Sequence, residues 1–151
     1  MNFPEHFLLG AATAAHQAEG NNVNSDCWAL ENIKHSDYLE KSGLAVDHYK
    51  CYEEDIRLLA EAGLNAYRFT IEWARLEPEE GKFDEKEIEH YRAVIRACKK
   101  NNVEPMVTLH HFSSPAWLIR KGGWEAQSTP DDFARYVEYV ISKLGSELTY
   151  V

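Results

Sequence analysis

Apolar residues recur at helical spacing in three long segments of the chain. The stripes are Tyr52, Ile56 and Leu59 in residues 51–62, Ile88, Tyr91, Ile95 and Cys98 after residue 84, and Phe133, Val137, Val140 and Leu144 before residue 145. Gly63 provides a stop for the first helix. Asp84 begins the second, with Glu87 three positions later as in a capping box. The third is predicted to open with Thr129 as N-cap and Pro130 at the first helical position.

Short β-like runs lie between these helices, and the resulting β-α-β-α-β-α-β order requires a parallel sheet with right-handed crossovers. The runs cover residues 7–15, 65–73, 104–111 and 148–151. The second run alternates, with Tyr67, Phe69, Ile71 and Trp73 on one face and Arg68, Thr70 and Glu72 on the other. Polar residues facing inward near the carboxyl end of a strand fit a barrel mouth better than an open sheet, whose parallel strands are usually apolar on both faces.

The last of these runs, residues 148–151, stops as a fourth strand begins. We therefore expect residues 1–151 to form one α/β unit that holds about strands 1–4 of a barrel. The loops after the strands, especially residues 18–46 and 112–128, are long. In parallel α/β folds, active sites gather on that side of the sheet.

Composition narrows the class of protein. With 44% hydrophobic residues the chain can bury a sizeable core, and 16 basic against 25 acidic residues give a net charge of −9. This charge disfavours nonspecific binding to nucleic acid or to an anionic membrane surface. The N-terminal residues 1–6 lack a basic segment followed by a long apolar run, and no segment is suited to spanning a bilayer, so a cytoplasmic location is expected. Cys27, Cys51 and Cys98 form no Cys-x-x-Cys pair, which favours reduced thiols.

Polar side chains from several strands should meet at the barrel mouth. They are Gln17 and Glu19 after the first run, Arg68 and Glu72 in the second, and His110 and His111 at the end of the third. Tryptophans 28, 73, 117 and 124 lie in or near the same loops, and aromatic faces beside polar groups suit a sugar ring. Packing of each tryptophan within the loops is an equally good interpretation. The two adjacent histidines point to opposite faces of a strand, so we expect neither a metal site nor a cofactor.

Residues 7–20, Phe-Leu-Leu-Gly-Ala-Ala-Thr-Ala-Ala-His-Gln-Ala-Glu-Gly, resemble the opening signature of glycoside hydrolase family 1, the retaining β-glucosidases, β-galactosidases and phospho-β-glycosidases. Further segments that resemble the family follow in the same order at residues 47–49, 54–56, 67–78, 109–112, 115–118 and 122–125. The resemblance covers essentially the whole chain. It implies a (β/α)8 TIM barrel, of which residues 1–151 are the N-terminal part.

The resemblance also implies roles for individual residues. Gln17 and His111 would hydrogen-bond hydroxyls of the non-reducing sugar, with Glu19 as a neighbour and Phe112 stacking nearby. Arg68 matches the arginine that lies beside the nucleophilic glutamate and favours its ionised form, although a structural ion pair is the alternative. Glu72 stands where serine is frequent in the family, so no catalytic role carries over to it.

The family mechanism needs two glutamates about 5 Å apart, an acid/base and a nucleophile. The resemblance puts both beyond Val151, so we assign no catalytic residue to this chain and expect the chain alone to be inactive. A β-linked sugar or β-glucoside is the expected ligand. Two other functions remain open: a carbohydrate-binding module without catalysis, and an assembly unit. An open half-barrel has unpaired edges, which favour self-association or binding of a complementary C-terminal half.

Overall fold

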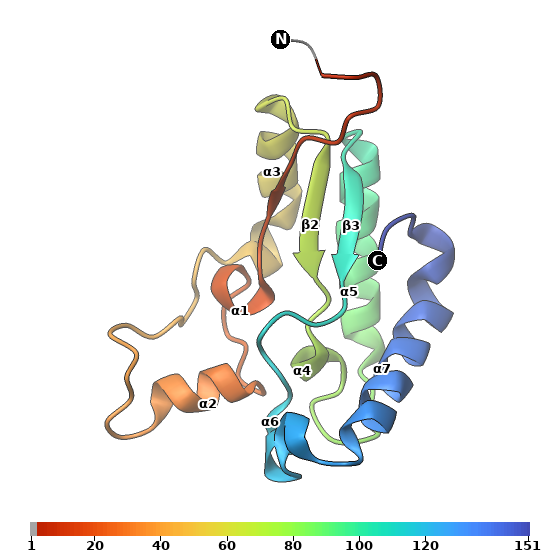
Figure 1. Cartoon of the computed structure of the whole chain (residues 1–151). Helices are drawn as coiled ribbons and strands as arrows, with labels where there is room; N and C mark the ends of the chain where they lie inside the picture. The colour runs from red at the N-terminus through yellow and green to blue at the C-terminus, as the bar shows by residue number, and fades with distance from the viewer. Residues whose placement is uncertain (1–2) are drawn as a thin grey trace.

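Three parallel strands form the centre of the structure. A computed structural model describes residues 3–151, so residues 1 and 2 of the N-terminal segment searched for a targeting signal lie outside the described residues. Strands β1 (Gly10–Ala12), β2 (Ala66–Thr70) and β3 (Glu104–Thr108) lie side by side in that order (Figure 1). Both pairings are parallel, as the sequence predicted.

A long helix follows each strand: α3 (His48–Glu61), α5 (Glu85–Lys100) and α7 (Thr129–Leu144). Helices α3 and α5 lie behind the sheet in Figure 1, α7 lies beside β3, and no described helix covers the front. None of the helices within residues 3–151 is both long and apolar enough to cross a membrane. The sheet therefore has one face packed against helices and one face that is open in the described part of the chain.

The loops after the strands and the segment after α7 contain short helices that the sequence analysis did not predict. They are α1 (Ala15–Ala18), α2 (Asp26–Asn32), α4 (Trp73–Leu76), α6 (Ala116–Arg120) and the 3₁₀ turns η1 (Gly123–Glu125) and η2 (Gly145–Glu147). Most of these complete little more than one turn, too little for an apolar period to emerge. In Figure 1 helices α1, α2, α4 and α6 lie beyond the carboxyl ends of the strands.

The observed strands are shorter than the predicted runs because the chain turns into these helices. The N-cap of α4 is Glu72, whose side chain accepts a hydrogen bond from the Ala74 amide, so β2 ends before Trp73. After β3, the left-handed backbone at Phe112 (φ 66°) breaks the extended run. Residues 148–151 form no assigned strand, but Tyr150 makes an isolated parallel bridge to Met106.

The helix ends also differ in detail from the prediction. Helix α3 begins three residues early, at His48. Asp84 caps α5 through the Lys86 amide, while Glu87 accepts a hydrogen bond from Tyr49 instead of completing a capping box. The N-cap of α7 is Ser128, because the Thr129 hydroxyl donates to the Gly123 carbonyl of the preceding loop.

The core lies between the sheet and the long helices. Tyr67, Phe69 and Ile71 on β2 and just after it are buried with the apolar stripes of α5 and α7. Trp73 stacks on Tyr136 of α7 with ring centroids 5.0 Å apart. Because successive strand side chains point to opposite faces, this packing turns Arg68 toward the open face of the sheet.

Candidate functional site

The loops after β1 and β3 pair with each other at the carboxyl end of the sheet. Ser25 and Pro115 form an antiparallel bridge, and the Asp26 amide donates to the Ser114 carbonyl at 2.8 Å. The Asp26 carboxylate in turn accepts from the Ser114 amide at 2.8 Å. These contacts bring the sequence-predicted residues near the first and third strands to one end of the molecule.

Gln17 lies on α1, directly after β1, and its side chain is exposed. Its backbone amide is fixed by a hydrogen bond to the Ala14 carbonyl at 3.1 Å. No side-chain hydrogen bond holds the Gln17 amide group within residues 3–151. An exposed amide on a fixed backbone is suited to bind hydroxyl groups as both donor and acceptor.

His110 and His111 have different surroundings. His110 packs edge-on against Trp124 at 4.7 Å and lies 6.3 Å from Phe133 of α7, while its Nε2 shares a hydrogen bond with the Ser114 hydroxyl. Burial lowers the pKa of His110, so this imidazole is neutral at physiological pH. His111 instead lies against Phe112, with ring centroids 4.6 Å apart.

His111, Phe112, His110 and Trp124 line an open hollow of about 500 Å³. Phe112 is 79% exposed and Trp124 is 51% exposed, so both present aromatic surface to a ligand. Within residues 3–151, no three His, Cys, Asp or Glu side chains lie close enough together to hold a metal ion. The hollow is suited to an apolar ring face with polar groups at its edge.

Arg68 lies half-buried on β2, and its Nη1 donates to the Thr13 carbonyl at 2.8 Å. No carboxylate of the described chain pairs with it. The structural ion pair that was the alternative for Arg68 therefore does not form among residues 3–151. Most of its donor capacity is left for a group on the open face of the sheet.

Glu19 has contacts other than the sugar contact that the family resemblance implied. Its carboxylate is 5% exposed and accepts hydrogen bonds from Arg75 Nε at 2.7 Å and from the Tyr91 hydroxyl at 3.0 and 3.2 Å. Burial raises the pKa of Glu19, while Arg75 opposes the shift. Glu19 thus links α1 to α4 and α5 below the mouth. No local pattern could have predicted these contacts of Glu19, because Arg75 and Tyr91 lie 56 and 72 residues away along the chain.

Glu72 is a second buried carboxyl, 1% exposed. It accepts hydrogen bonds from the Ser113 hydroxyl at 2.5 Å and from the Ala74 amide at 3.1 Å. Burial raises its pKa to about 7 against the effect of these two donors. Ser113, which joins Glu72 to the loop after β3, was not singled out in the sequence.

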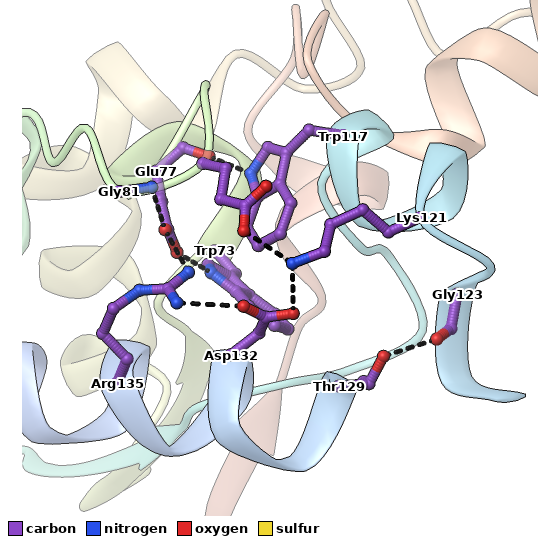
Figure 2. Close-up of polar contacts among 10 residues, drawn as sticks. Trp73, Glu77, Gly81, Trp117, Lys121, Gly123, Thr129, Asp132 and Arg135 are labelled. Carbon is purple, nitrogen blue, oxygen red and sulfur yellow. Dashed lines mark hydrogen bonds and ion pairs between the residues drawn. The ribbon is translucent and has the colours of Figure 1, made fainter. Parts of the chain in front are cut away.

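Two of the four tryptophans belong to a structural network (Figure 2). Glu77 is fully buried and accepts from Trp73 Nε1, the Gly81 amide and Arg135 Nη2, each at 2.7 Å. Trp117 Nε1 donates to the Glu77 carbonyl at 2.8 Å. Both indoles therefore pack and hydrogen-bond inside the loops, as the alternative interpretation held for them.

Asp132 extends this network, accepting from Lys121 at 2.8 Å and from Arg135 at 2.9 Å. Figure 2 shows Lys121 reaching Asp132 from the chain segment that follows α6. The loops after β2 and β3 are thereby anchored to α7, which supports the end of the sheet where the hollow lies.

Comparisons with known proteins agree on one family. The sequence model of glycosyl hydrolase family 1 matches residues 1–151. The chain is 36% identical over 154 residues to β-glucosidase A of Acetivibrio thermocellus, covering 96% of the chain and 34% of the relative. It is 37% identical over 157 residues to a 6-phospho-β-galactosidase of Clostridium acetobutylicum, covering 97% and 32%.

Solved structures give the same result. The β-glycosidase BGL167 matches with a TM-score of 0.95 and 53% identity, over 97% of this chain and 35% of that structure. A β-glycosidase from Pyrococcus horikoshii matches with a TM-score of 0.92 and 43% identity, over 99% and 34%. The chain thus spans about a third of the length of the relatives that it matches.

Proposed function

The chain belongs to glycosyl hydrolase family 1, and we propose that it supplies part of the sugar site of a retaining β-glycosidase. The observation that carries this proposal is that the exposed Gln17 side chain follows the carboxyl end of β1, and the hollow beside His111 follows the carboxyl end of β3 in the same parallel sheet. Active sites of (β/α)8 barrels form at that end. In this proposal β1, β2 and β3, with residues 148–151 as the start of a fourth strand, are the N-terminal part of such a barrel.

We assign Gln17 and His111 to the hydroxyls of the non-reducing sugar. Phe112 offers its exposed face to the C–H side of the ring. Glu19 supports the site indirectly. Its carboxylate accepts hydrogen bonds from Arg75 and Tyr91, which fixes the segment that carries Gln17. The relatives include β-glucosidases and 6-phospho-β-galactosidases, which supports β-glycosides as the substrate class.

The reaction passes through a covalent glycosyl-enzyme that requires two carboxyl groups about 5 Å apart. No residue of this chain is assigned to either role. Arg68 contributes by placing a positive charge on the open face of the sheet, where it favours the ionised form of a nucleophilic carboxylate. The remaining strands of the barrel, which bring both glutamates, are the proposed partner, and the finished site takes a β-glucoside.

Binding of methyl β-D-glucopyranoside to the whole chain, followed by NMR, tests the sugar site. We expect the side-chain signals of Gln17 and His111 to shift on addition of the sugar. Gln17→Ala and His111→Ala should each weaken binding about tenfold, the effect of one lost hydrogen bond to a ligand. The matched controls are Gln127→Ala and His6→Ala, exposed residues of the same types outside the site. Equal losses in the controls, or no shift in the wild type, would refute the proposal.

A further inference from the structure

A chain of two hydrogen bonds connects Glu72 to the segment that carries His111. The Ser113 hydroxyl donates to Glu72 at 2.5 Å, and the Ser113 amide donates to the His111 carbonyl at 2.9 Å. Phe112, between His111 and Ser113, has a left-handed backbone with φ 66°. A non-glycine residue is held in that conformation only by its surroundings, so the contacts of this turn decide its shape.

The turn is held from both sides. The Leu109 carbonyl before it accepts from the Tyr136 hydroxyl at 3.0 Å. Ser114 after it is fixed by Asp26 and accepts a hydrogen bond from Trp124 Nε1 at 3.0 Å. Between these two fixed points, the bond from Ser113 to Glu72 is the contact that joins the turn to the end of β2.

No cationic side chain of residues 3–151 forms an ion pair with the Glu72 carboxyl. The charged and titratable groups near it are Glu19 after α1, Cys27 on α2, Arg75 on α4, Tyr91 on α5 and Tyr136 on α7. His110 and His111 lie in the turn itself, and Asp26 on α2 contacts the turn through Ser114. Arg75 is the nearest candidate, but its guanidinium already donates to Glu19 and to the Gly20 carbonyl. Within residues 3–151, the Glu72 carboxyl therefore accepts hydrogen bonds only from neutral donors, the Ser113 hydroxyl and the Ala74 amide.

We propose that Glu72 is a positioning residue for the sugar site: its hydrogen bond to Ser113 fixes the turn that presents His111 and Phe112. This inference rests on the proposed sugar site. It also makes the site sensitive to pH, because ionisation of Glu72 puts an unpaired charge into a buried place and favours opening of the turn to water. Burial raises the pKa of Glu72 to about 7 in the closed turn, against 4.5 for an exposed carboxyl, so the turn loses stability as the pH rises from about 4.5 to about 7.

Three single variants of the whole chain and one double variant test the role of this contact. Glu72→Gln keeps both contacts, since the amide oxygen can accept from Ala74 and the NH₂ can donate to the Ser113 hydroxyl, but it cannot ionise. Glu72→Ala and Ser113→Ala each remove the connection. We expect both to weaken binding of methyl β-D-glucopyranoside about tenfold, and the double variant to lose no more than either alone.

The pH dependence of sugar binding distinguishes a positioning role of Glu72 from a purely structural one. The wild type should bind the sugar more weakly at pH 8 than at pH 6, and Glu72→Gln should lose the part of this dependence that comes from Glu72. The His111 and Ser113 amide signals should follow the same titration in the wild type but not in Glu72→Gln. Glu87→Gln is the control, because Glu87 is a half-buried carboxyl of raised pKa that contacts Tyr49 and not the turn.

The readouts distinguish this inference from the proposed function. A wild type that binds no sugar would refute the sugar site, while the amide titration would still decide whether Glu72 controls the turn. The inference would be overturned if the His111 and Ser113 amide signals showed the same pH dependence in the wild type and in Glu72→Gln. Unchanged sugar binding in both alanine variants would also overturn it.

Discussion

At the scale of single residues, Glu19 and Glu72 show how similar burial leads to different electrostatics. Both carboxyls are almost completely buried, and burial raises the pKa of each. Glu19 has the guanidinium of Arg75 at 2.7 Å, whereas Glu72 has only the Ser113 hydroxyl and the Ala74 amide. The charged form of Glu72 is therefore the more costly one in the folded protein.

This difference predicts how stability depends on pH. The pKa of Glu72 is about 7 in the folded chain and near 4.5 when unfolded, so between these values the folded state binds more protons. Stability then falls as pH rises through this window, and the Glu72 contribution approaches about 3 kcal/mol. Urea unfolding at pH 5 and pH 8 measures it. Glu72→Gln should lose less free energy of unfolding over this range than the wild type, and an equal loss in both would contradict the assignment.

At the scale of elements, what the sequence could reveal depended on length and on distance along the chain. The stripes of α3, α5 and α7 repeat over three or more turns and were recognisable. Helices α1 and α4 have four residues each and were predicted as strand ends or loop. The strand pattern placed Gln17, Arg68 and His111 at the barrel mouth, and family resemblance supplied their individual roles. The contact between Glu72 and Ser113 joins residues 41 positions apart, and no local pattern records such a pair.

Replacement of Glu77 tests whether the network of Figure 2 holds these elements together. Glu77→Ala removes a fully buried carboxylate that three donors share, including Arg135 on α7. We expect a loss of roughly 2–4 kcal/mol in the free energy of unfolding, because the Trp73 indole and the Gly81 amide are left without an acceptor. Urea denaturation followed by circular dichroism measures it. The control Glu80→Ala removes a half-exposed partner of Lys121 and should cost less than about 1 kcal/mol. Similar losses in both variants would count against the anchoring role.

At the scale of the whole molecule, the sheet is two-faced. Helices α3 and α5 cover one side of the sheet. On the other side β1 is exposed, and Met106 on β3 is partly exposed between two buried neighbours. Exposed strand backbone and an uncovered sheet face both favour association with further strands. The chain spans about a third of the length of the relatives that it matches.

The last prediction is that the chain self-associates or binds a fragment carrying the remaining strands of a family 1 barrel. Alone, it should not hydrolyse 4-nitrophenyl β-D-glucoside above the buffer rate, because the reaction needs an acid/base and a nucleophilic carboxyl and we assign neither to this chain. Mixed with the fragment, it should gain both mass, by analytical ultracentrifugation, and activity. Met106→Asp puts a charge on the open face and should block association, whereas Leu58→Asp on the exposed side of α3 should not. A chain that stays monomeric, unfolds cooperatively and ignores the fragment would be an independent domain, and the uncovered face would then need no partner.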